Sequence, residues 1–177
     1  MKLFKRLWRK VKAYEIDEAV IGIGNQKVKI RPNYQDIRIA YKLWVELGTR
    51  KIGLEIDLDN DVISEIYDSW YEFFRLTREL IKDIPVSKIR KDESTKELVR
   101  IAIEVLNEGI RPHLTRWQAI FRKWYKAAIE ADENKGLSPQ DIQKNYPDYA
   151  KLTKEMLEVN KRIMEYRKIL KQLAMGE

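Results

Sequence analysis

Residues 59–85 place the strongest constraint on the fold of this chain. Their apolar side chains recur at steps of three and four residues, which is the repeat of an amphipathic helix. They are Val62, Ile63, Ile66, Trp70, Phe73, Phe74, Leu80, Ile81 and Ile84. At about 100° per residue the apolar arc covers roughly half of the helix circumference. Because a surface helix needs only one stripe, the pattern predicts a helix at the centre of a bundle, with two or three neighbours.

The composition agrees with a helical protein, since the chain has only five prolines and seven glycines among 177 residues. That length indicates one domain, which buries about 70% of the surface that the unfolded chain exposes. The chain has no cysteine, so disulfides, thiolate zinc sites and cysteine nucleophiles are excluded. No apolar run approaches the roughly 18 residues needed to cross a bilayer, and we expect a cytoplasmic protein.

Local signals divide the chain into a basic amphipathic helix over residues 1–14 and a single domain over residues 15–177. Alternating apolar residues on both sides of Gly24 and Asn25 predict a small β-hairpin at about 19–30. Caps, prolines and the helical period predict helices at about 34–50, 60–84, 95–131, 139–145 and 147–174. The expected fold class is therefore all-α, a bundle of four to five long helices with a small N-terminal β-hairpin.

The helix predicted at 95–131 contains Gly109 and Pro112, residues that ordinarily end a helix. The apolar positions before and after these residues nevertheless keep the same helical phase. The pattern therefore favours two collinear helices with a kink near residues 109–112 over a reversal of the chain.

The final helix carries a heptad seam, in which apolar residues alternate in steps of three and four. The seam consists of Tyr149, Leu152, Met156, Val159, Ile163, Tyr166, Leu170 and Leu173. Such a seam fits either an antiparallel helix of the same chain or a second copy of the chain. In a sequence rich in long helices the internal partner is favoured, and a homo-oligomer through residues 149–173 is the alternative.

The formal net charge of +7 is unevenly distributed along the chain. Residues 2–12 contain six cations and no acid, which leaves a net charge of only +1 for residues 13–177. On a helix these cations lie opposite an apolar face. The segment is expected to dock on the core or fray in solvent, or to bind an acidic partner or an anionic membrane surface. The candidate partner- or membrane-binding residues are Lys2, Lys5, Arg6, Trp8, Arg9 and Lys10.

A second group of cations lies in residues 111–126, where no acid occurs. Its members, the candidate anion- or nucleic-acid-binding residues, are Arg111, Arg116, Arg122, Lys123 and Lys126. Such a row fits nucleic-acid phosphates or an acidic protein partner, and it equally fits solvent or the acidic run at residues 55–72. The solvated or self-paired interpretation is favoured.

No catalytic residue, metal ligand or cofactor site is expected. His113 is the only histidine, which excludes a two-histidine metal centre, and its helical angle predicts a place at the boundary of the core. Asp57, Asp59 and Asp61 have the spacing that opens a calcium loop, but Val62 stands where that loop needs glycine. We expect these carboxylates to satisfy the first amides of the central helix instead.

The absence of a catalytic constellation favours a non-enzymatic interaction or accessory subunit that docks on a partner protein or assembly. A nucleic-acid-binding accessory protein that uses the basic face of residues 111–126 is the alternative, and peripheral membrane association through residues 2–14 is a further one. An enzyme is compatible with the sequence only if a partner chain completes its site.

Overall fold

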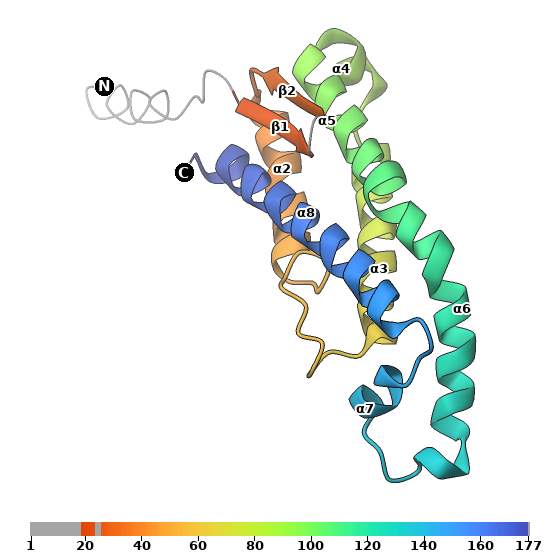
Figure 1. Ribbon diagram of the computed structural model, residues 1–177. Helices are drawn as coiled ribbons and strands as arrows, with labels where there is room; N and C mark the ends of the chain where they lie inside the picture. The colour runs from red at the N-terminus through yellow and green to blue at the C-terminus, as the bar shows by residue number, and fades with distance from the viewer. Residues whose placement is uncertain (1–18, 24–25, 177) are drawn as a thin grey trace, which may run out of the picture.

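The computed structural model of the protein describes residues 19–23 and 26–176. These residues are predominantly helical, which confirms the all-α class predicted from the sequence. Strand β1 (Ala19–Ile23) pairs antiparallel with β2 (Gln26–Ile30), with Val20 opposite Lys29 (Figure 1). The basic segment 1–14 and the turn residues 24–25 lie outside the described residues.

Helix α2 (Tyr34–Gly48) and helix α8 (Tyr149–Met175) pack side by side along much of their length (Figure 1). The heptad seam of α8 is the buried face of this helix. Its buried residues are Leu152, Met156, Val159, Ile163, Tyr166, Leu170 and Leu173, whereas Tyr149 is half-buried. Strand β1 also contacts α8. The seam therefore packs within the chain, against α2 and β1.

Helix α3 (Ile63–Lys82) lies behind α8 in Figure 1, between α2 and α6 (Arg111–Glu130). It buries a broad face, as the sequence predicted for the central helix. The buried residues of this face are Ile63, Ile66, Tyr67, Trp70, Phe73, Phe74 and Thr77. Burial of apolar side chains on this scale is the main stabilising contribution to such a fold.

The start of α3 differs from the prediction. The side chain of Gln143, not an aspartate, accepts a hydrogen bond from the amide of Ile63 at 2.8 Å. The Gln143 amide also donates to the carbonyl of Asp61 at 2.9 Å. The predicted capping by carboxylates is therefore wrong, because the side chain of Gln143, 80 positions away in the chain, accepts the hydrogen bond at the start of the helix.

A short helix, α4 (Val86–Lys91), occupies the segment between the helices predicted at 60–84 and 95–131. It follows Pro85, and the half-buried Ile89 packs on the core. Helix α5 (Glu93–Glu104) begins after Asp92, whose carboxylate accepts from the amides of Ser94 and Thr95. The sequence predicts the start of this helix at about residue 95, two residues further along the chain.

Helices α5 and α6 form one rod through a π-helical turn, η2 (Val105–Ile110) (Figure 1). The chain does not reverse at Gly109, and Pro112 is the second residue of α6. A π-turn widens the backbone by one residue, which accommodates a proline that cannot donate an α-helical hydrogen bond. Beyond α6, η3 (Asp132–Asn134) and α7 (Pro139–Lys144) lead into α8.

Candidate functional site

A groove of about 480 Å³ lies between α3 and α6, and three arginines line it. We call it the arginine groove. Its lining residues are Tyr71, Phe74 and Arg78 of α3 and Arg111, Leu114, Thr115, Gln118, Ala119 and Arg122 of α6. Its volume falls in the range of about 300–1,000 Å³ that is typical of ligand sites.

Each helix contributes one stripe to the groove. On α3 the lining residues are spaced by three and four positions, and those on α6 follow the same helical repeat from Arg111 to Arg122. The π-helical turn immediately before Arg111 rotates every later residue of α6 by about 100° relative to an uninterrupted α-helix. This turn therefore helps to direct the α6 stripe toward α3.

The first end of the groove carries Arg78 and Arg111. The Arg111 guanidinium lies over the ring of Phe74, 5.1 Å from its centroid, and its Nε donates to the side chain of Asn107 at 3.0 Å. Neither arginine forms an ion pair with another residue of the described chain. Both cations are thus free to accept an anionic ligand, and Phe74 holds one of them in place.

The second end of the groove carries Arg122, which forms an ion pair with Asp68 of α3. Phe74 meets Arg111 while Asp68 meets Arg122, so α3 and α6 run antiparallel along the groove. Arg111 and Arg122 are eleven positions apart on one helix. The two ends are therefore separated by about 16 Å along the helix axis.

The middle of the groove combines apolar and polar side chains. Tyr71 is 59% exposed, and Leu114 and Ala119 contribute aliphatic surface next to it. Thr115 and Gln118 add hydrogen-bonding groups. The arrangement places arginines at both ends, of which Arg122 is paired with Asp68, and a surface of mixed apolar and polar groups between them.

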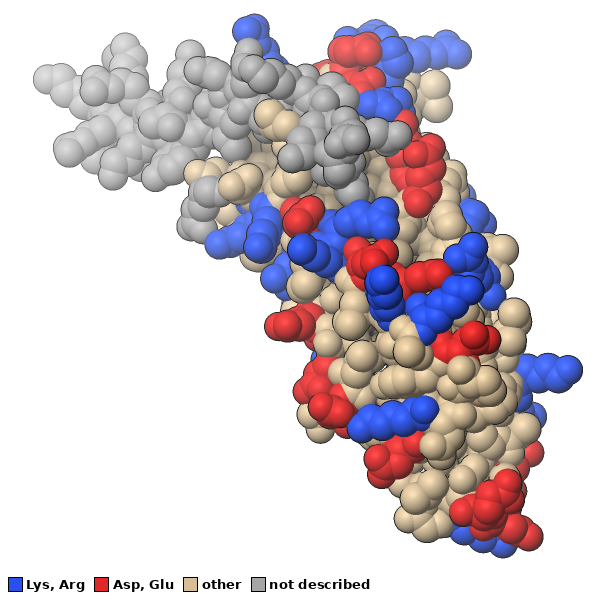
Figure 2. Space-filling model, in the orientation of Figure 1, with Lys and Arg blue, Asp and Glu red and all other residues tan. Residues whose placement is uncertain are grey.

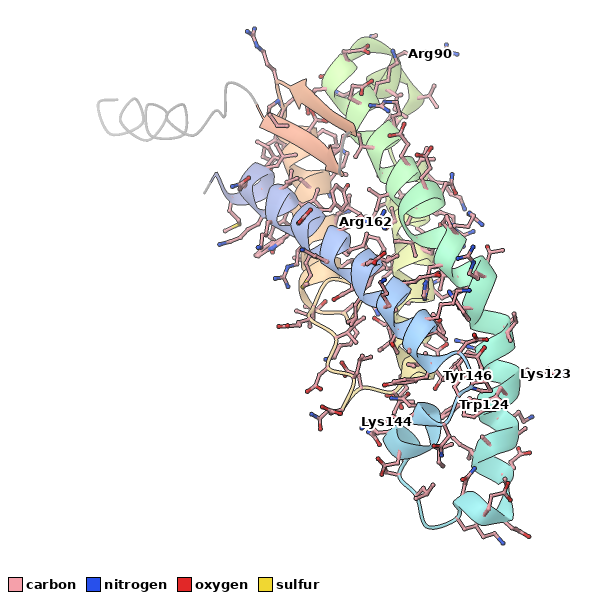
Figure 3. All side chains as sticks on the ribbon, viewed as in Figure 1. Arg90, Lys123, Trp124, Lys144, Tyr146 and Arg162 are labelled. Atoms are coloured by element: carbon pink, nitrogen blue, oxygen red, sulfur yellow. The ribbon has the colours of Figure 1, made fainter. Side chains whose placement is uncertain are left out.

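The five predicted anion-binding residues do not form a single row in the structure. Arg111 and Arg122 line the groove, but Arg116 points to α8, where it pairs with Glu155 at 3.0 Å. Lys123 lies on the outer side of α6 (Figure 3), and Lys126 is also exposed. The candidate residues of segment 2–10 lie outside the described residues.

Sequence reasoning missed the α3 side of the groove. Phe74 is a core residue, as the sequence predicts, and it also lines the groove, but the sequence does not single out Tyr71 or Arg78. The available signal was the spacing of Tyr71, Phe74 and Arg78 along one stripe, next to the wholly apolar face. This spacing indicates a groove only when α6 is known to pack beside α3.

His113 lies in the core beside the groove and does not line it. It is only 4% exposed, its Nε2 lies 3.1 Å from the hydroxyl of Tyr67, and its ring lies 5.5 Å from that of Trp70. Burial lowers the pKa of His113 to about 4, although the charge of Glu155 acts in the opposite direction. The boundary position expected from the helical angle is therefore wrong, and the imidazole is neutral near pH 7.

Carboxylates of the acidic loop before α3 form hydrogen bonds and an ion pair with neighbouring residues. Asp57 accepts hydrogen bonds from the side chain of Asn60 at 2.7 Å and from the amide of Asp59 at 3.0 Å. These bonds lower the pKa of Asp57. Asp61 pairs with Lys51 at 2.8 Å. Within the described part of the chain, no cluster of three or more histidine, aspartate or glutamate side chains is arranged to hold a metal ion.

No helix of residues 19–23 and 26–176 is both long enough and apolar enough to cross a membrane. Comparison of the chain with protein-family models, with curated proteins and with solved structures finds no match. The function is therefore inferred from the geometry of the arginine groove.

Proposed function

We propose that this protein is a non-enzymatic interaction subunit, a helical bundle that docks an acidic segment of a partner protein in the arginine groove. The observation that carries this proposal is the placement of Arg78 and Arg111 at one end and Arg122 at the other, around a centre that combines apolar and polar side chains. A groove with this pattern fits a ligand that has anionic ends and an apolar middle.

Arginine suits such a ligand because its planar guanidinium matches the geometry of a carboxylate. Phe74 lies under the Arg111 guanidinium, which limits the side-chain freedom that binding would otherwise remove. Tyr71 is well exposed and offers an aromatic surface to an apolar side chain of the partner. An amphipathic segment that lies along two neighbouring helices is a common mode of peptide recognition.

A nucleic-acid single strand is the second candidate ligand. Its phosphates would pair with the arginines, and a base would stack on Tyr71, which is 59% exposed. An extended phosphate-binding surface is less well supported, because acidic and basic side chains intermingle on the face drawn in Figure 2. Arg116 is also occupied by Glu155, which leaves the predicted row broken.

Fluorescence anisotropy with the full chain tests the proposal. The probe is a fluorescein-labelled peptide with glutamates at both ends of a leucine-rich centre, and a labelled oligothymidylate single strand is the comparison. The variant Arg78→Gln/Arg111→Gln should bind the peptide about ten- to a hundredfold more weakly, because each charge-assisted hydrogen bond contributes about 1.5–3 kcal/mol before losses elsewhere.

The matched control is Lys123→Gln/Lys126→Gln, which removes the same charge from exposed positions outside the groove. This control should change the peptide affinity by less than about twofold. An equal loss in both double variants would show that binding depends on net charge and would overturn the proposal. Tighter, groove-dependent binding of the oligothymidylate would promote the nucleic-acid alternative.

A further inference from the structure

We infer that Asp68 occupies the binding position of a partner carboxylate in the free protein and is displaced when the partner binds. This inference rests on the proposed function and assigns a regulatory role within the same groove. Of the three groove arginines, Arg122 alone has a carboxylate partner within the described part of the chain. That partner, Asp68, is an exposed residue of α3 at the edge of the groove.

The Asp68–Arg122 ion pair is weak enough for another carboxylate to replace Asp68. Both side chains are substantially exposed, at 71% and 41%, and ion pairs of this kind are weak because water and salt screen them. The Asp68 carboxylate accepts from no described group besides Arg122. A carboxylate of the partner can therefore replace it at little cost, since one pair is broken and a chemically equivalent pair is formed.

The two ends of the groove consequently differ. Within the described residues Arg78 and Arg111 have no carboxylate partner, so an acidic group competes with none of these residues there. At Arg122 an incoming acidic group competes with Asp68 for the guanidinium. A partner that carries acids at both ends therefore competes with Asp68, whereas a partner with a single acidic end does not need to.

The separation of the ends describes the partner further. Arg111 and Arg122 lie about 16 Å apart along α6. This distance corresponds to about eleven residues of a helical partner or about five residues of an extended one. The expected partner segment therefore carries acidic residues at one of these spacings, with apolar residues between them.

The test compares Asp68→Asn with Glu72→Gln in the full chain. Both substitutions remove one negative charge from α3, but Glu72 pairs with Arg75 at 2.6 Å and does not line the groove. Asp68→Asn should tighten binding of the peptide with two acidic ends by about two- to fivefold, which is the range expected for loss of a weak exposed competitor. Glu72→Gln should leave this affinity almost unchanged.

Two further measurements locate the effect. A peptide with glutamates at one end only, which binds Arg78 and Arg111, should not distinguish Asp68→Asn from the wild type. In the background of Arg122→Gln, the substitution Asp68→Asn should give no further gain, because the site of competition has been removed.

An equal gain in peptide affinity from Asp68→Asn and Glu72→Gln would show that the effect comes from the net charge of α3. That result would overturn the inference. The inference about Asp68 is also overturned if Asp68→Asn does not change the affinity while the wild type binds the peptide through Arg78 and Arg111. In that case the proposed function of the groove still stands. If the wild type binds neither peptide, both proposals fail. If only the oligothymidylate responds to Asp68→Asn, the occupant is a phosphate and the carboxylate assignment is overturned.

Discussion

The side-chain amide of Asn33 donates a hydrogen bond to the carboxylate of Asp92, and this bond joins the N-terminal caps of two helices. Asn33 caps α2 by accepting from the amide of Asp36 at 3.0 Å, and Asp92 caps α5 by accepting from the amide of Ser94 at 3.1 Å. The buried carboxylate of Asp36 completes the cluster, since it accepts from the hydroxyls of Ser94 and Thr95. The starts of α2 and α5 are thereby fixed to one another.

Replacing Asp36 with alanine should destabilise the protein by about 3 kcal/mol. The substitution leaves the Thr95 hydroxyl and the Asn33 backbone amide without the carboxylate that accepts from them, and each unsatisfied buried group costs about 1–3 kcal/mol. The Ser94 hydroxyl keeps a second acceptor, the carboxylate of Asp92. Urea unfolding measures the loss. The control Asp83→Ala, at an exposed position after α3, should stay within about 0.5 kcal/mol of the wild type. Equal losses in the two variants would show that the cluster does not stabilise the fold.

Part of this arrangement was predictable from the sequence. Asn33 followed by Asp36 is a local capping signal, and the helix does begin there. The link from Asn33 to Asp92 could not be predicted, because a cap pattern identifies one helix terminus and does not say which other terminus lies beside it. The hydrogen bond from the first amide of α3 to the side chain of Gln143 was not predicted for the same reason.

Replacing Gly53 with alanine should destabilise the protein by about 1–3 kcal/mol or more. A Cβ atom at this position would lie 2.2 Å from the carbonyl oxygen of Leu47 and 2.8 Å from its carbonyl carbon, so backbone would have to move. Thermal and urea unfolding give the change in stability.

Gly48 provides the matched control for that substitution. It is the last residue of α2, and a Cβ atom there meets nothing within 4 Å. Gly48→Ala should therefore be neutral or stabilising by up to about 1 kcal/mol, because alanine favours the helix. Similar destabilisation by the two substitutions would contradict the close approach of residues 47 and 53.

The buried imidazole of His113 predicts a specific pH dependence of stability. Its pKa is about 4 in the folded protein against an ordinary value of 6.5, so the unfolded chain binds the additional proton between these values. The free energy of unfolding should accordingly rise with pH from about 4 to 6.5, by up to about 3 kcal/mol from this residue. Above pH 6.5 the contribution is complete, and below about pH 4 it is lost.

His113→Phe tests this dependence, because phenylalanine keeps an aromatic ring in the core and cannot take up a proton. Urea unfolding of both proteins should be measured at pH 4.5 and pH 7. Carboxylates titrate in both proteins, so the difference between their pH profiles isolates the histidine. Parallel profiles would contradict the assignment of a depressed pKa to His113.

The arginine groove could be predicted only in part from the sequence. The cations of α6 were recognised and a kink near residues 109–112 was predicted. The π-helical turn before Arg111, which changes the direction of every later side chain, was not predicted. Arg78 was overlooked because its role depends on the antiparallel neighbour of α3. Faces can be derived from a helical period within one helix, whereas the pairing of two faces is a property of the tertiary structure.

The most direct test of the account is amide chemical-shift mapping of the full ¹⁵N-labelled chain during titration with the peptide that has two acidic ends. The largest shifts should cluster in residues 71–78 of α3 and 111–122 of α6, and they should disappear in Arg78→Gln/Arg111→Gln. Shifts confined to α8 or to residues 2–14, with the groove unchanged, would contradict it.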